Sequence, residues 1–158
     1  MAPRVPTLHN IYPVDSSTSP PTVNPFFAAD TADWSATTLY TNQTADGYPC
    51  LTTSTYGAKL NFTLSGIAAF ILAGSCDWMQ GLYTVAVSSD TPGATSSIPD
   101  NAIQYSARSL WTQENMFKYM AAGLDVNATY TVEITNLGDS FNLAAVYVYD
   151  VIPASEPR

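Results

Sequence analysis

The residues best suited to binding chemistry lie in a short loop between two glycines, Gly74 and Gly81. The loop brings together a carboxylate, a large aromatic ring and an amide, supplied by Asp77, Trp78 and Gln80. A flat aromatic ring can stack on an apolar ligand face, while carboxylate and amide groups can pair with hydroxyls. This combination is suited to binding a sugar. The same residues could instead be structural, with Trp78 covering an edge of the fold and Asp77 accepting hydrogen bonds from turn amides.

A second group of the same chemical kind follows about thirty residues later. It contains Arg108, Trp111 and Glu114. These residues could bind a ligand in the same way, or Trp111 could belong to the core. The remaining tryptophan, Trp34, is expected in the core.

Conventional catalytic motifs do not occur in the sequence. His9 lies in a proline-rich segment, which is a poor place for the base of a serine triad, and no Gly-x-Ser-x-Gly, phosphate loop or dinucleotide motif is present. A glycosidase needs two facing carboxylates, and Asp77 with Glu114 is the pair we could propose. An unorthodox enzyme of this kind, or one that works by pocket shape, stays open as an alternative.

No cofactor or metal is expected from the sequence. Cys50, Cys76 and His9 do not make a plausible zinc site. A structural calcium ion is conceivable on acidic loop residues such as Asp77, Asp100 or Asp139, but no Asp-x-Asp-x-Asp spacing supports it.

The charge balance excludes two classes of partner. The formal net charge is −8, and only 11% of the residues are charged, against roughly 25% in an average soluble domain. The basic residues form no cluster that could neutralise phosphates, so nucleic acid and anionic membrane surfaces are not expected partners. No apolar stretch approaches the roughly 20 residues of a membrane span. Glycans, proteins and a second copy of the chain remain as partners.

Cysteines and glycosylation sequons favour an extracellular or cell-surface location. Cys50 and Cys76 are the only cysteines, and we predict a disulfide between them, with two buried free thiols as the alternative. Sequons occur at Asn42, Asn61 and Asn127, of which Asn127 lies in a predicted turn.

Short strands separated by turns account for most of the chain. Residues 58–64 alternate and place Leu60, Phe62 and Leu64 inward, whereas residues 67–72 are apolar on both faces and indicate a central strand. Further strands are predicted at residues 81–87, 115–122, 130–135 and 141–151. The strands recur about every ten residues without a credible long helix, which predicts an all-β antiparallel sandwich.

The two ends of the chain differ from this pattern. Residues 1–28 contain six prolines and predict an extended arm, which could dock along the sandwich. The sandwich is expected at residues 29–152, and residues 153–158 resemble the start of a linker or stalk.

The sequence GAKLNFTLSGI at residues 57–67 matches the pattern GA-x-hydrophobic-x-F-x-F-x-G, except that Leu64 replaces the second Phe. In this pattern and in the order of its predicted strands, the chain resembles a family of fungal cell-surface or secreted ectodomains with a galactose-binding-like jelly roll, similar to carbohydrate-binding modules. Residues 81–87 match G-x-Y-x-V-x-hydrophobic. The likeness resumes at residues 116–124 and 130–136, where Tyr130 stands in place of a family His. The resemblance spans residues 34–149 and implies the fold and the compartment, but it supplies no ligand or catalytic residues.

These observations favour a non-catalytic extracellular recognition module that binds a cell-wall or surface glycan. The predicted ligand-binding residues are Asp77, Trp78, Gln80, Arg108, Trp111 and Glu114. A self-associating structural surface protein is the second hypothesis, because the chain has little charge and many Thr and Tyr residues. The unorthodox enzyme is the third.

Overall fold

The computed structural model describes residues 4–40, 46–90 and 103–153, and every regular element within these ranges is a β-strand. All pairings between these strands are antiparallel, which confirms the predicted all-β antiparallel sandwich. The strands in chain order are β1 (Arg4–Ile11), β2 (Val14–Asp15), β3 (Thr22–Val23), β4 (Ala28–Ala29), β5 (Trp34–Leu39), β6 (Tyr48–Thr53), β7 (Lys59–Ser65), β8 (Ile67–Cys76), β9 (Leu82–Ser89), β10 (Gln104–Ser106), β11 (Gln113–Ala122), β12 (Thr129–Asn136), β13 (Phe141–Leu143) and β14 (Ala145–Pro153).

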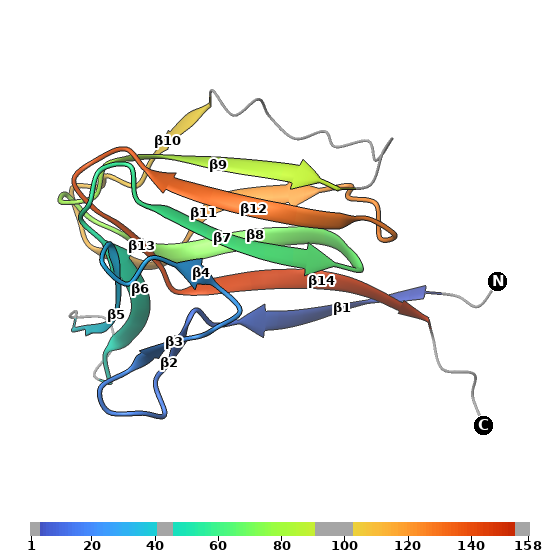
Figure 1. Ribbon diagram of the computed structural model, residues 1–158, viewed down its shortest axis with the longest axis horizontal. Helices are drawn as coiled ribbons and strands as arrows, with labels where there is room; N and C mark the ends of the chain where they lie inside the picture. The colour runs from blue at the N-terminus through green and yellow to red at the C-terminus, as the bar shows by residue number, and fades with distance from the viewer. Residues whose placement is uncertain (1–3, 41–45, 91–102, 154–158) are drawn as a thin grey trace.

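Two main sheets face one another with the core between them (Figure 1). One is a four-stranded sheet in the order β1-β14-β8-β11, and the other a five-stranded sheet in the order β10-β9-β12-β7-β4. A three-stranded sheet, β13-β6-β5, lies at one end of the sandwich, and β2 pairs with β3 in a small ribbon beside it.

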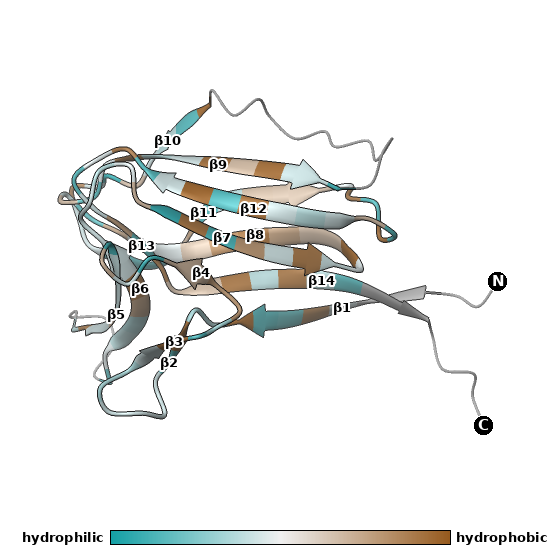
Figure 2. Ribbon diagram, in the orientation of Figure 1, coloured by the Kyte–Doolittle hydropathy of each residue, from teal (hydrophilic) through white to brown (hydrophobic). Residues whose placement is uncertain are grey.

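The alternation of apolar residues positions the strands of the five-stranded sheet. In β7 the side chains of Leu60, Phe62 and Leu64 are buried, as predicted, because successive side chains point to opposite faces of a strand. Figure 2 shows this alternation as hydrophobic and hydrophilic bands along β7 and β12. The continuous apolar run predicted as a central strand is β8, which lies between β14 and β11 in the four-stranded sheet. Burial on both faces explains why this strand has no alternating pattern.

The prediction of a strand at residues 115–122 is confirmed by β11, which begins two residues earlier and ends at the same residue. Its register against β8 shifts at two places, between Gln113 and Met116 and again between Phe117 and Tyr119. The second shift turns Tyr119 into the core while Phe117 is exposed, so these two residues do not share a face as simple alternation suggests. It also places Lys118 in the interior.

The predicted N-terminal arm is part of the sandwich. β1 pairs with β14 along its whole length, from Arg4 opposite Pro153 to Ile11 opposite Val146. An edge strand tolerates prolines because one side of its backbone has no ladder to complete. Farther along, Val14 and Phe27 are buried in the main core. The boundary expected at residue 28 therefore does not separate an arm from a domain in the structure.

The last predicted strand is divided in two. β13 pairs with β6 in the three-stranded sheet, whereas β14 pairs with β1 and β8 in the four-stranded sheet. At the break, the backbone N–H of Ala144 donates to Ala73 O at 2.8 Å. The segment passes from one sheet to the other at this residue, and the apolar sequence on both sides carries no signal of the change.

The predicted disulfide is absent from the structure, in which Cys50 and Cys76 are both free thiols. Cys50 belongs to β6 and packs with Tyr48 and Ala144 in a small cluster, whereas Cys76 ends β8 and packs against the main core. Burial raises the pKa of Cys50 to about 12 and also raises the pKa of Cys76. Neither thiol is therefore a reactive thiolate at neutral pH.

No helix that is long and apolar enough to cross a membrane is found among the described residues.

Candidate functional site

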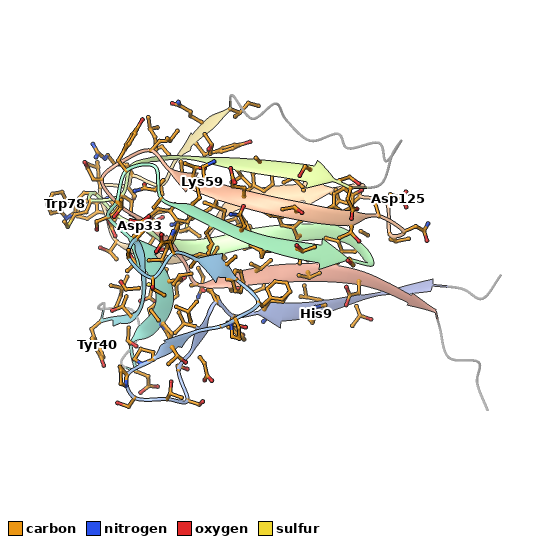
Figure 3. All side chains as sticks on the ribbon, viewed as in Figure 1. His9, Asp33, Tyr40, Lys59, Trp78 and Asp125 are labelled. Atoms are coloured by element: carbon orange, nitrogen blue, oxygen red, sulfur yellow. The ribbon has the colours of Figure 1, made fainter. Side chains whose placement is uncertain are left out.

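The two polar and aromatic loops singled out in the sequence meet at one end of the sandwich. Asp77 and Arg108 form an isolated backbone bridge, and the backbone N–H of Ser109 donates to Asp77 O at 3.0 Å. The backbone N–H of Ala107 also donates to Gly81 O at 3.0 Å. Residues about thirty positions apart in the chain are thus held side by side. Figure 3 places Trp78 at this end of the molecule, opposite the free ends of β1 and β14.

The two tryptophans of these loops are exposed. The exposed fraction is 66% for Trp78 and 74% for Trp111, and the adjacent Met79 and Leu110 are exposed as well. We call these four residues the tryptophan platform. Large apolar side chains that gather at the surface mark binding sites more often than they do elsewhere on a soluble protein. Trp34, by contrast, is buried, as predicted.

The carboxylate of Asp77 is used to hold its own loop. Its Oδ1 accepts hydrogen bonds from the backbone N–H groups of Met79 at 2.8 Å and Gln80 at 3.0 Å. A carboxylate that accepts such bonds fixes a tight turn. This geometry favours the structural alternative for Asp77 and leaves little of the carboxylate for a catalytic role.

Gln80 is buried, so it cannot contact a ligand at the surface. Its Nε2 donates to Ser75 O at 2.7 Å and to Asp77 Oδ2 at 3.2 Å, and its Oε1 accepts from Lys118 Nζ at 2.7 Å. Lys118 also donates to the backbone O of Asn142 at 2.7 Å. The prediction that Gln80 contacts a ligand is therefore not supported by its position. Its amide instead joins the Gly74–Gly81 loop to the buried Lys118.

Arg108 links the two loops to a third. Its Nε donates to Gln80 O at 3.0 Å and its Nη2 donates to Asp139 Oδ2 at 2.8 Å. The hydroxyl of Ser140 donates to Met79 O at 3.1 Å, which ties the same third loop to the platform. Such contacts hold the tryptophans on a defined base, so little conformational entropy is left to lose when a ligand binds.

Glu114 lies at the first register shift of β11, directly after Gln113, which is opposite Cys76. Burial raises the pKa of Tyr48 to about 12, and the negative charge of Glu114 contributes to that rise. The structure therefore holds the loops that carry Asp77, Trp78, Arg108 and Trp111 side by side and buries Gln80. It places the charge of Glu114 close enough to Tyr48 to raise the pKa of that tyrosine.

Lys118 gives the protein a titratable group in its interior. Burial lowers the pKa of Lys118 to about 7. In the unfolded chain the ammonium loses its proton only near pH 10.5. Above pH 7 the unfolded chain therefore binds a proton that the folded protein lacks, and folding stability rises with pH.

We expect the free energy of unfolding to increase between pH 7 and pH 9, by up to about 1.4 kcal/mol per pH unit. Above pH 9 the rise levels off, because folded Cys50 keeps a proton that the unfolded thiol loses, which offsets the proton difference at Lys118. Urea unfolding at pH 7, 8 and 9 measures this dependence. The variant Lys118→Met removes the titrating group and should show a flat profile, and an equally steep rise in that variant would contradict the assignment.

The remaining predicted sites lie elsewhere. Asn127 is exposed in the turn before β12, where its backbone N–H donates to Asp125 Oδ1 at 2.9 Å. Asn61 lies within β7 between Glu133 of β12 and Ala28 of β4. Asn42 and Asp100 fall outside the described residues. Within the described ranges, no group of three or more His, Cys, Asp or Glu side chains could hold a metal ion.

The structure also contains a groove that the sequence did not indicate. Its walls come from residues 10–12, 14–17, 22–25, 48–49, 115, 144–145 and 147. Because these segments are far apart in the chain, no local motif marks them.

No protein-family model and no curated protein sequence matches this chain. Among solved structures, a family two carbohydrate esterase from Cellvibrio japonicus matches with a TM-score of 0.46 and 14% identity, over 96% of this chain. This chain spans only 36% of the esterase chain. The CBM36-1 domain of a multidomain xylanase from the hindgut metagenome of Trinervitermes trinervoides matches with a TM-score of 0.40 and 14% identity, over 77% of this chain and 95% of that domain. Both TM-scores are below 0.5, so neither likeness bears on the function of this chain.

Proposed function

We propose that this protein is a non-catalytic glycan-recognition module that binds through the tryptophan platform. The observation that carries the proposal is the exposure of Trp78 and Trp111 on two loops that are locked to each other. An exposed indole loses contact with water when a ligand covers it, and it offers a flat face to the C–H groups of a sugar ring. The hydrogen-bonding side chains at this end, Arg108 and Asp139, can pair with sugar hydroxyls.

The polar groups near the platform support binding rather than catalysis. The carboxylate of Asp77 is occupied by the amides of its own turn, and the charge of Glu114 acts on Tyr48. A glycosidase needs two carboxylates on either side of one bond. The enzyme hypothesis therefore receives no support from this pair.

We also propose an extracellular location for the module. The exposed Asn127 sequon and the low content of charged residues support it. The buried thiols of Cys50 and Cys76 are compatible with an oxidising compartment, because burial protects them.

Substitution of the platform tryptophans tests the proposal. Pull-down on insoluble cellulose, xylan, mannan, chitin and β-1,3-glucan identifies a polysaccharide that the protein binds, and titration with its soluble oligosaccharide gives the affinity. We expect Trp78→Ala and Trp111→Ala each to weaken binding by about 30-fold, as truncation of a central tryptophan typically costs about 2 kcal/mol.

Tyr40→Ala is the matched control, because Tyr40 is an equally exposed aromatic residue that lies away from Trp78 (Figure 3). This variant should bind like the unmodified protein. The proposal fails if the protein binds none of the polysaccharides, or if the double tryptophan variant binds as tightly as Tyr40→Ala.

A further inference from the structure

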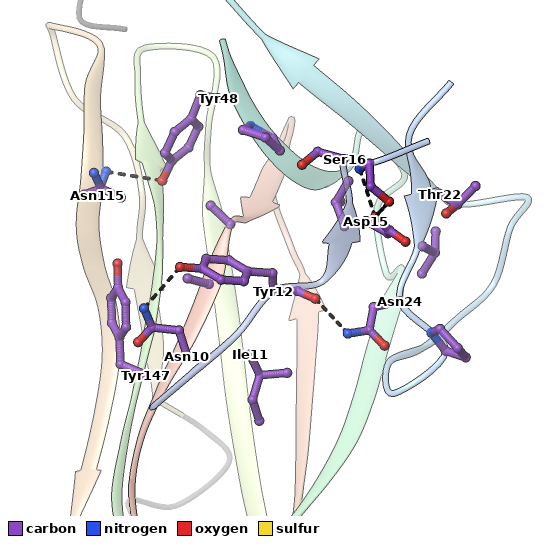
Figure 4. Close-up of a pocket in the computed structure, with 17 residues that line it drawn as sticks. Asn10, Ile11, Tyr12, Asp15, Ser16, Thr22, Asn24, Tyr48, Asn115 and Tyr147 are labelled. Atoms are coloured by element: carbon purple, nitrogen blue, oxygen red, sulfur yellow. Dashed lines mark hydrogen bonds between the residues drawn. The ribbon is translucent and has the colours of Figure 1, made fainter. Parts of the chain in front are cut away.

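The groove is a separate concave site, distinct from the platform. It has a volume of about 980 Å³. It is lined on one side by the segment that follows β1 and on the other by residues of β6, β11 and β14. Ligand pockets in proteins usually measure about 300–1,000 Å³, so this groove is large enough for an oligosaccharide. Figure 4 shows the side chains of Tyr12, Tyr48 and Tyr147 entering it from three different strands or turns, with their hydroxyl ends directed toward one another.

The lining has the chemistry of a site for hydroxyl groups. Three tyrosine rings supply apolar faces, and the other polar side chains are amides, hydroxyls and one carboxylate. These polar residues are Asn10, Asp15, Ser16, Ser17, Thr22, Asn24 and Asn115. Amides and hydroxyls both donate and accept hydrogen bonds, as sugar hydroxyls do. The lining includes no Lys, Arg or His, so nothing in it compensates the charge of an anion.

Asn115 lines the groove at a bulge in β11. Between Gln113 opposite Cys76 and Met116 opposite Gly74, two residues of β11 face one residue of β8. The extra residue is accommodated because Asn115 has a left-handed backbone, with φ of 54°. Asparagine tolerates this conformation better than most residues, and bulges often redirect a side chain beside a binding site.

The bulge also frees the backbone of Asn115 to support the groove wall. Its N–H donates to the Tyr48 hydroxyl at 3.2 Å, so the contact does not consume its side-chain amide. On the opposite wall, Asn10 Nδ2 donates to the Tyr12 hydroxyl at 3.1 Å and Asn24 Nδ2 donates to Tyr12 O at 2.9 Å. The hydroxyls of Tyr12 and Tyr48 are therefore held in place before any ligand arrives, which lowers the entropy cost of binding.

We propose that this groove is a second ligand site, which binds an uncharged segment of an oligosaccharide. The tyrosine faces stack on sugar rings, and Asn115, Asn10 and Asn24 bind their hydroxyls. The carboxylate of Asp15 and the net charge of −8 disfavour acidic sugars. The site does not depend on the tryptophan platform.

Amide chemical shifts locate binding at each site independently. The probes are neutral hexasaccharides of β-1,4-xylose, β-1,4-glucose, β-1,4-mannose and β-1,3-glucose, with a galacturonate oligomer as the acidic comparison. We expect at least one neutral probe to shift the backbone amides of Tyr12, Tyr48, Asn115 and Tyr147. The galacturonate oligomer should not shift them.

Three variants separate the groove from the platform and from structural effects. Asn115→Gly keeps the left-handed backbone but removes the amide, and it should weaken groove binding by about 5-fold, the value of one hydrogen bond. Tyr12→Ala should weaken it further. Tyr149→Ala is the matched control, because Tyr149 is on β14, two residues after Tyr147, and does not line the groove.

In the Trp78→Ala/Trp111→Ala double variant, the neutral probe should still change the chemical shifts of the groove amides. The platform proposal can therefore fail while the groove proposal holds. The groove proposal is overturned if no neutral probe shifts its amides. It is also overturned if the galacturonate oligomer binds there equally well, or if Asn115→Gly and Tyr12→Ala bind like Tyr149→Ala. Perturbation of the Trp78 and Trp111 indole signals alone would support the platform and refute the groove.

Discussion

Replacing Gly138 with alanine is expected to lower the free energy of unfolding by about 3 kcal/mol or more, because the new Cβ would overlap neighbouring backbone atoms. A Cβ built at Gly138 lies 2.5 Å from Gly81 Cα and 2.5 Å from Leu82 N. Both contacts are with backbone, which cannot rotate away as a flexible side chain could. Nearby backbone hydrogen bonds, from Leu137 N to Leu82 O at 2.8 Å and from Gly81 N to Ser140 O at 3.2 Å, hold the two segments at this distance.

Gly123→Ala is the matched control for this prediction. Gly123 has φ of +70° but no atom within 4 Å of an added Cβ, so alanine there costs only the backbone strain of about 1–2 kcal/mol. Urea unfolding followed by circular dichroism compares the two variants. A smaller loss of stability in Gly138→Ala than in Gly123→Ala would show that the two turns can separate more easily than their contacts suggest.

The approach of Gly81 and Gly138 also matters for the site. Asp139 follows Gly138 directly and accepts a hydrogen bond from Arg108, whose Nε binds Gln80 O at the base of the platform. Movement of the 137–140 turn would therefore shift the platform. If the Gly138→Ala variant remains folded, it should bind the glycan less tightly than the Gly123→Ala variant does.

The sequence predicted those parts of the fold that depend on local burial. The alternation at Leu60, Phe62 and Leu64 survives in β7, because one face of that strand is in the core and the other faces outward. The continuous apolar run that became β8 was equally readable. The pairing of strands that are far apart in the chain could not be predicted from the sequence. Proline in residues 1–28 indicates an extended chain but does not say that β14 is its partner.

The candidate site was predictable to a similar degree. Trp78 and Trp111 lie between glycine and polar residues, which marks loops, and both are exposed. Gln80 looks like a surface residue in the sequence, yet it is buried because its amide matches Lys118, 38 residues farther along the chain. Lys118 itself points inward because the register of β11 shifts between Phe117 and Tyr119. A strand pattern without bulges would place its side chain differently, so neither partner of this hydrogen bond could be found from local sequence.

The buried network around Lys118 is expected to be as sensitive to substitution as the Gly138 turn. Asn142→Leu is expected to lower the free energy of unfolding by about 3–5 kcal/mol, because it removes three buried hydrogen bonds at once and leaves polar groups without partners. Asn142 Oδ1 accepts from Ser75 N at 2.9 Å and from Lys118 Nζ at 3.2 Å, and its Nδ2 donates to Ser75 Oγ at 2.7 Å. Leucine has a similar volume, so the loss would report the hydrogen bonds more than a cavity.

Asn142→Asp separates the loss of hydrogen bonds from the loss of shape. The carboxylate keeps an acceptor for Ser75 N and Lys118, and the Ser75 hydroxyl can rotate to donate to it. Its negative charge beside the ammonium raises the pKa of Lys118, so the increase in stability between pH 7 and pH 9 should become shallower than in the unmodified protein. Urea unfolding of both variants at pH 7 and pH 9 gives both quantities. A single hydrogen bond usually contributes about 1 kcal/mol. If Asn142→Leu lowers the free energy of unfolding by less than this, the network does not stabilise the fold as a unit, and other contacts must hold the platform in place.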